Sequence, residues 1–231
     1  MQRVKRHGLV YVAFVAGSGL LAITLVSGVA QALRTLHRLP GITPLDSLDE
    51  ARANAARGDG MRSLREYRVA SRLALGDLGA FEEYAQAVGR SGDRPGELTA
   101  WLRARGQWPE SARVHAGLGY AFLGNQRPDE ALASFGLALR LNPFDWAAHA
   151  GRGDALRARG RLPEAIEAYG SALRLAPGEA GLRNKLGIAY ALAGMREQAM
   201  AQFVEALRLD PGTPGAAENI EKLRAGGEGG R

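Results

Sequence analysis

Two histidines, His115 and His149, stand 34 residues apart in this chain, and imidazole nitrogens are common metal ligands. A structural zinc site needs four donors, whereas the chain has no cysteine and no carboxylate evidently partners the two histidines. Histidines at repeated positions more often pack against neighbouring helices. We therefore interpret both as packing residues and predict neither a metal nor a cofactor.

Motifs of catalysis are missing as well. The sequence has no thiol nucleophile, no Gly-x-x-x-x-Gly-Lys phosphate loop, no Gly-x-Ser-x-Gly elbow and no His-Glu-x-x-His zinc motif. Four carboxylates come just after turns or at expected helix starts, where the helix dipole favours negative charge; they are Asp129, Glu130, Glu164 and Glu197. The sequence predicts no catalytic residues and a protein that is not an enzyme.

The elements that carry these residues follow a fixed period. Aromatic residues recur every 34 positions, and an alanine follows each of them after three residues. The two series are Tyr67, Trp101, Phe135, Tyr169, Phe203 and Ala70, Ala104, Ala138, Ala172, Ala206. A constant internal period indicates one structural unit copied along the chain, and we interpret the aromatic residues as its packing core.

Each copy is predicted to be a pair of antiparallel helices. Apolar residues three or four apart, such as Leu118 and Phe122, share one face of a helix. A glycine that permits a tight turn recurs between two such runs, at Gly58, Gly92, Gly160 and Gly194, with Gln126 in the third copy. A proline ends the second run, at Pro109, Pro143, Pro177 and Pro211.

These residues resemble the tetratricopeptide repeat (TPR) family, whose pattern is Leu-Gly-x-x-Tyr, then Ala-x-x-x-Phe and a later Pro. The fifth copy matches with Leu186, Gly187, Tyr190, Ala199, Phe203 and Pro211. The first two copies are degenerate, because Glu50, Asn54 and Glu97 replace apolar or small residues. The resemblance implies an all-α, right-handed superhelical solenoid of stacked helix pairs, with repeats at 44–77, 78–111, 112–145, 146–179 and 180–213.

The C-terminal end of the stack needs a cover for its apolar face. Residues 214–231 are predicted to form a capping helix followed by a flexible tail. Its apolar residues Ala216, Ala217, Ile220 and Leu223 are expected to face the repeats.

Residues 1–33 are predicted to hold a membrane span, followed by a linker at 34–43. The apolar segment 9–29 would be roughly 31 Å long as a helix, close to the thickness of a bilayer core. This length favours a signal-anchor over a cleaved signal peptide, whose apolar region is usually about 7 to 15 residues. Cleavage after Ala30-Gln31-Ala32, with its small-x-small form, is the alternative.

The orientation of this span is predicted from its flanking charges. Arg3, Lys5 and Arg6 precede it and would stay in the cytoplasm, which places the repeats outside, in the periplasm of a bacterial-type cell. Arg34 and Arg38 follow the span closely, so the charge difference between the two sides is small.

The net charge of +6 does not by itself indicate nucleic-acid binding. Three of the 30 basic residues precede the apolar segment, which leaves 27 against 24 acidic residues. Acidic and basic residues alternate through the repeats, and no basic stripe or nucleic-acid motif is present. We predict no nucleic-acid partner.

The resemblance implies that the first helix of each repeat lines a groove that binds peptides or helices of partner proteins. Carried over by position, the candidate groove residues are Arg113, Tyr120, Asp154, Arg157, Asn184, Lys185 and Ile188. Some relatives bind acidic C-terminal peptides through Lys and Asn, but Ala116 and Tyr120 stand at those positions here. Tyr120 is expected to point away from the face of Leu118 and Phe122 and to anchor a partner, or else to pack against the next repeat.

Three functions remain open on the sequence. The first is a membrane-anchored protein–protein interaction module, acting as a scaffold or assembly factor for a cell-envelope complex. The second is an exported, soluble, chaperone-like periplasmic protein whose signal is removed. The third is a non-catalytic regulatory subunit of a membrane polysaccharide or secretion machine.

Overall fold

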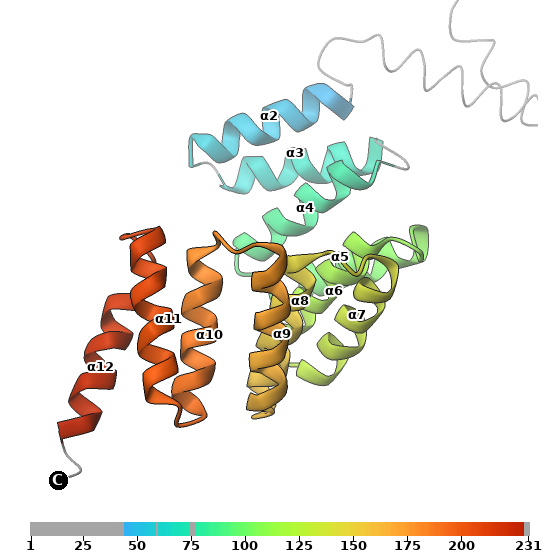
Figure 1. Cartoon of the computed structure of the whole chain (residues 1–231). Coiled ribbons are helices and arrows are strands. Elements are labelled where there is room, and N and C mark those ends of the chain that lie inside the picture. Colours follow the sequence, from blue (N-terminus) through green and yellow to red (C-terminus); the bar gives the residue numbers. More distant parts are fainter. Residues whose placement is uncertain (1–43, 59, 74–76, 229–231) are drawn as a thin grey trace, which may run out of the picture. The chain divides into compact units, whose positions relative to one another are not determined.

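The computed structural model describes residues 44–58, 60–73 and 77–228, which form helices with no strand among them (Figure 1). Within this part of the chain, no helix combines the length and apolar character needed to cross a bilayer. The predicted span at 9–29 lies outside the described residues. The chain divides into two compact units between Ala80 and Phe81, and each is considered by itself.

The first unit contains the helix pair α2 (Pro44–Ala56) and α3 (Gly60–Leu73), which pack against each other. Gly58 makes the turn between them with a φ of 79°. Asn54, which breaks the apolar pattern, is buried, and its side-chain oxygen accepts a hydrogen bond of 2.8 Å from Arg57. This bond satisfies the amide oxygen where the repeat pattern calls for an apolar residue.

The second unit begins at Phe81, within α4, and continues through α12. Its helices are α4 (Leu78–Arg90), α5 (Arg94–Gln107), α6 (Ala112–Gly124), α7 (Pro128–Leu141), α8 (Trp146–Ala158), α9 (Leu162–Leu175), α10 (Ala180–Leu192), α11 (Arg196–Leu209) and α12 (Ala216–Glu228). From α5 onward each helix packs against the next, and α9 to α12 lie side by side in Figure 1. The order of contacts follows the order of the chain, as in a solenoid.

The helices begin and end at regular intervals because the residues that set their ends recur along the chain. The second helices α5, α7, α9 and α11 each stop two residues before the recurring proline, as predicted. Asp93, Ser111 and Asp145 accept hydrogen bonds from backbone amides in the first turns of α5, α6 and α8. Glycines at the α4–α5, α8–α9 and α10–α11 turns have positive φ, and Gln126 adopts the same geometry, with a φ of 58°, between α6 and α7.

Glycines of the first helices make room for the aromatic rings. A Cβ atom built on Gly119 of α6 would lie 2.6 Å from the ring of Phe135, and one on Gly151 of α8 would also overlap that ring. The ring is therefore held between two first helices, and it is fully buried. These glycines therefore contact the aromatic side chain directly.

The aromatic series is buried throughout, which confirms its role as the packing core.

One position that departs from the repeat pattern is accommodated by its neighbours. Glu97 is buried where a small residue is expected, and the absence of a side chain at Gly89 makes space for its carboxyl group. Arg94 binds the same carboxylate at 3.0 Å, so the buried charge is paired.

Helix α12 covers the C-terminal end of the second unit and packs against both α11 and α10. Ala216, Ile220 and Leu223 are buried, the last two against Ala199 and Phe203. The prediction was wrong for Ala217, which is exposed because one residue along a helix turns the side chain by about 100°. The helix also continues to Glu228, into the segment predicted to be a flexible tail.

Candidate functional site

A hollow of about 370 Å³ lies on the first helices α4 and α6. We call it the aromatic hollow. Side chains from α4, α5 and α6, together with the residue that caps α8, surround it; they are Glu82, Gln86, Glu97, Trp101, Arg113, Ala116, Gly117, Tyr120 and Asp145. Two of the predicted groove residues, Arg113 and Tyr120, are therefore brought together here.

Trp101 and Tyr120 form the aromatic walls. The Trp101 ring lies against the backbone of Gly117, where a Cβ would come within 2.5 Å of it. Tyr120 stands edge-on to Phe135, with ring centroids 5.0 Å apart, and its hydroxyl donates a 2.6 Å hydrogen bond to the carbonyl of Ala147 in α8. Both walls are thus fixed before any partner arrives.

This geometry agrees with the second of the two expectations for Tyr120, that it packs against the next repeat. Its ring contacts Phe135 and its hydroxyl bonds to α8, while the residue remains 39% exposed. Burial raises the pKa of the Tyr120 phenol above its ordinary value, and the charges of Asp154 and Asp145 raise it further. The hydroxyl therefore stays protonated and acts as a donor to Ala147 at neutral pH.

Carboxylates outnumber cations around the aromatic hollow. Glu82 is held by Arg113, with the Arg113 Nε atom 3.3 Å from a carboxylate oxygen. Asp145 accepts a 3.0 Å hydrogen bond from the backbone amide of Ala148. Glu97 is paired with Arg94, as Glu82 is with Arg113, and among the described residues no cation pairs with Asp145. The lining therefore keeps a net negative charge at Asp145, which favours a positively charged group.

Three other predicted groove residues bind one another. Asp154 accepts hydrogen bonds of 2.6 Å from both the Tyr169 hydroxyl and the Lys185 ammonium group, and Arg157 lies 3.9 Å from it. Burial raises the pKa of the Tyr169 phenol, and the Asp154 charge adds to the effect. This cluster connects α8, α9 and α10 and lies outside the lining of the aromatic hollow.

The last two predicted residues help to hold the cap. Asn184 is buried; its side-chain amide donates to the carbonyl of Pro214 and accepts from Asn219. Ile188 packs against the core formed by Phe203, Ile220 and Leu223. Helix α12 takes the place of a further first helix, so these positions on α10 contact it instead of lining an open groove.

The repeated histidines contact the linkers before their own helices. A ring nitrogen of His115 lies 2.7 Å from the carbonyl of Pro109, and that of His149 lies 3.0 Å from the carbonyl of Pro143. Arg183, at the same position one repeat later, donates to the carbonyl of Pro177. This agrees with their interpretation as packing residues; among the described residues, no group of three metal donors is present.

Several lining residues were not predicted. Gln86 stands 34 residues before Tyr120, and Glu82 stands 34 before Ala116, so extending the repeat register into the degenerate second repeat would have found both. Trp101 was assigned to the core alone, although it also forms a wall of the hollow.

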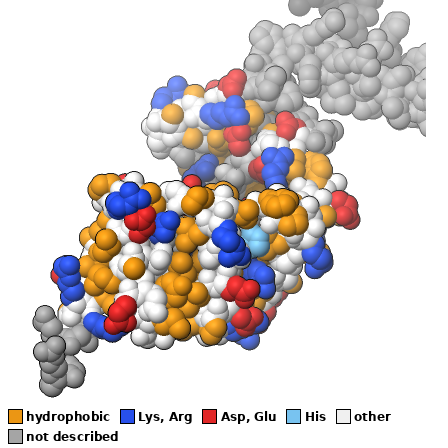
Figure 2. Space-filling model, in the orientation of Figure 1, with side chains coloured by type: hydrophobic (Ala, Val, Ile, Leu, Met, Phe, Trp, Pro, Cys, Tyr) orange, Lys and Arg blue, Asp and Glu red, His pale blue; other side chains and the backbone are white. Residues whose placement is uncertain are grey.

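On the face drawn in Figure 2, acidic and basic side chains are interspersed, without a large area of one sign.

Comparison with known families identifies the repeat. The tetratricopeptide repeat model matches residues 85–145, 117–180 and 151–214, which together cover more than half of the chain. The chain belongs to the tetratricopeptide repeat family. TPR proteins are generally non-catalytic interaction modules, and the aromatic hollow lies within the matched region except for one edge on α4.

Solved TPR structures share the fold at low sequence identity. A thermophilic TPR protein of Thermus thermophilus aligns with a TM-score of 0.69 and 20% identity, over 79% of this chain and all of that one. YrrB, a TPR protein with an unusual peptide-binding site, aligns with a TM-score of 0.58 and 20% identity, over 82% and 98%. A chain of the APC/C hetero-tetramer Cut9–Hcn1 aligns with a TM-score of 0.69 and 18% identity, over 88% of this chain and 40% of that one. No curated protein matches the sequence significantly.

Proposed function

We propose that this TPR chain is a protein-interaction module whose first-helix face binds a segment of a partner protein, with one side chain of that segment in the aromatic hollow. The observation that carries the proposal is a preformed space of about 370 Å³ between a buried tryptophan and a half-exposed tyrosine. Aromatic residues in preorganised pockets are common centres of binding energy.

The charge of the hollow selects the incoming side chain. A lysine or arginine would meet the Asp145 carboxylate, and the exposed part of the Tyr120 ring would attract the same cation. An acidic segment would meet repulsion there. We therefore propose that the bound segment carries a basic residue next to apolar ones.

Two structural neighbours support a protein partner. YrrB has a peptide-binding site, and Cut9 assembles with Hcn1, so the same fold serves peptide binding and complex assembly elsewhere. The low identity of both neighbours means that their binding residues are not transferred to this chain.

We also propose that the module is membrane-anchored through residues 9–29, with its repeats outside the cytoplasm, and serves as a scaffold or assembly factor for an envelope complex. The length of the apolar segment supports this proposal. The test is a carbonate wash of membranes followed by N-terminal sequencing. An anchored chain stays in the pellet and begins at Met1, whereas a soluble chain beginning at Leu33 would overturn the anchor.

Peptide display tests the binding face. Dodecapeptides selected from a random library on the full-length chain are expected to carry a lysine or arginine near apolar residues. Tyr120→Ala should weaken them by about thirtyfold or more, as is typical of a buried aromatic contact. Val204→Ala, which truncates an exposed side chain on α11, is the control and should leave their affinity unchanged.

Thermal unfolding is measured for each variant. Equal binding to wild type and to a folded Tyr120→Ala variant would rule out the aromatic hollow as the site. Tyr120→Phe keeps the ring and loses only the hydrogen bond to Ala147, so it should retain most of the affinity.

A further inference from the structure

A second hollow, of about 440 Å³, lies where α7, α8 and the start of α9 meet. We call it the arginine hollow. Leucines and a glycine form its apolar lining, and three guanidinium groups accompany them; the residues are Leu132, Gly136, Leu139, Arg140, Arg152, Leu156 and Arg161. It shares no lining residue with the aromatic hollow.

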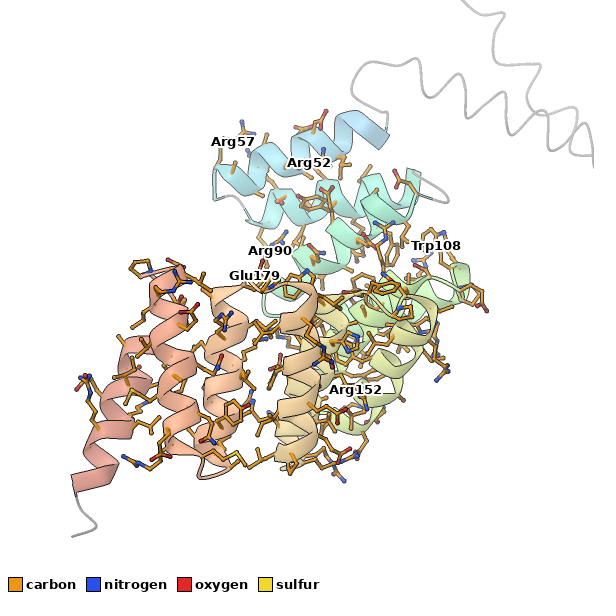
Figure 3. The ribbon with its side chains drawn as sticks, viewed as in Figure 1. Arg52, Arg57, Arg90, Trp108, Arg152 and Glu179 are labelled. Atoms are coloured by element: carbon orange, nitrogen blue, oxygen red, sulfur yellow. The ribbon has the colours of Figure 1, made fainter. Side chains whose placement is uncertain are left out.

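Arg152 departs from the repeat pattern at this place. The TPR pattern has leucine at this position of the first helix, and the equivalent residues Leu118 and Leu186 are buried. Arg152 is exposed instead and lines the hollow; Figure 3 shows it beside α7 and α9. A residue that breaks a packing rule without filling the core is expected at functional positions.

The charges of the hollow are only partly neutralised. Within the part of the chain that the structure describes, no hydrogen bond or ion pair joins Arg140 or Arg152 to another residue. Arg161 binds Glu164 through two nitrogens, with one contact at 2.7 Å. This bond is the main reason that the pKa of Glu164 is lowered, and the charge of Arg152 contributes further. The three arginines and Glu164 together leave an excess of positive charge.

We propose that the arginine hollow is a second binding site, which takes an acidic segment of a partner protein with an apolar residue beside its carboxylates. The planar guanidinium groups of Arg140 and Arg152 suit carboxylates, which they bind through paired hydrogen bonds. The leucine floor, with Leu156 buried beneath, suits the neighbouring apolar side chain. The site is separate from the one proposed on the first-helix face.

The surroundings favour a narrow protein segment over a membrane surface. Three carboxylates lie in the first turns of α7 and α9; Glu164 binds Arg161 of the hollow, while Asp129 binds Arg159 and Glu130 binds Arg127. A broad anionic bilayer would meet these carboxylates as well as the arginines, whereas a short segment can reach the hollow alone. Membranes usually attract clusters of basic residues without interspersed acidic ones.

Arg152→Leu provides a test that should not unfold the protein, because it restores the residue found at the equivalent buried positions. Dodecapeptides from a random display library are selected on the full-length chain and counter-selected on Arg152→Leu. The enriched peptides should contain aspartate or glutamate beside leucine, isoleucine or phenylalanine. Their affinity should fall at least about tenfold on Arg152→Leu, as expected for the loss of a charge-assisted pair.

Two control variants separate this site from general charge effects and from the aromatic hollow. Arg174→Leu removes an exposed arginine of α9 that lies outside the hollow, and it should leave the affinity unchanged. Tyr120→Ala should also leave these peptides bound, so failure of one site is distinguished from failure of the other.

Failure to enrich any peptide that depends on Arg152 would overturn the proposal, as would Arg152-dependent peptides without acidic residues. The same variants are tested on vesicles of phosphatidylglycerol and phosphatidylcholine. If vesicle binding needs Arg152 while no acidic peptide does, the hollow recognises a lipid headgroup and the protein partner is refuted.

Discussion

The aromatic hollow and the arginine hollow belong to one helical stack but differ in charge and in origin. The first is lined by three carboxylates and one guanidinium, and the second by three guanidiniums. The aromatic hollow is built mainly from first-helix positions that recur with the repeat, such as Gln86 and Tyr120. The arginine hollow exists where Arg152 replaces a packing leucine. In a repeat protein, a regular surface and a single irregular residue can thus provide sites of opposite specificity.

Both hollows should rest on one rigid core. Substitution of Phe135 tests this, and it has the largest expected effect. Phe135→Ala empties the fully buried space between Gly119 and Gly151 and removes the ring against which Tyr120 stands. The free energy of unfolding should fall by about 3–5 kcal/mol, as for other buried phenylalanines. Urea denaturation measures it, and a loss below about 1 kcal/mol would show that the ring does not support the stack.

Arg152→Leu tests whether the arginine hollow arises because Arg152 replaces a packing leucine. If Arg152 occupies a packing position, the leucine should raise the free energy of unfolding by about 1 kcal/mol or more. Full burial of leucine contributes about 1.5–3 kcal/mol, and the aliphatic part of Arg152 already covers some of the same surface. Thermal and urea unfolding of the wild type and of Arg152→Leu measure this difference. A destabilised leucine variant would mean that Arg152 supports the junction itself.

Gln126→Gly has the smallest expected effect, and it acts at the turn between α6, which lines the aromatic hollow, and α7, which lines the arginine hollow. Gln126 adopts a left-handed backbone conformation that glycine adopts without steric cost. The substitution should stabilise the fold by about 0.5–1 kcal/mol and leave peptide binding at both hollows unchanged. Gly160→Gln, at the equivalent turn, is the reverse control and should destabilise the fold by a similar amount.

The fold could be predicted closely because its signals repeat. The glycine and proline positions gave helix ends within a residue or two, since each acts through local backbone geometry. Two details of α12 differed from the prediction: Ala217 lies on its exposed face, and the helix extends to Glu228.

The candidate site could be predicted only in part. Position within the repeat places Arg113 and Tyr120 on the first-helix face, and both line the aromatic hollow. Repeat position alone gives the wrong surroundings for Asn184 and Ile188, because it does not show that the segment of Pro214 and α12 covers them. It also fails to show that Asp154 is engaged by Tyr169 and Lys185, since those contacts depend on how neighbouring helices pack.

The central claim is that a partner segment occupies the aromatic hollow, and photo-crosslinking in the native cell tests it most directly. The photoreactive residue p-benzoylphenylalanine replaces Gln86, an exposed residue of the hollow, in the full-length chain; Glu167, exposed on α9 outside it, receives the same residue as the control. The account predicts a discrete crosslinked partner from position 86 that disappears with Tyr120→Ala and is absent from position 167. Mass spectrometry should place the crosslink beside a lysine or arginine of that partner. No crosslink from position 86, or the same products from both positions, would contradict it.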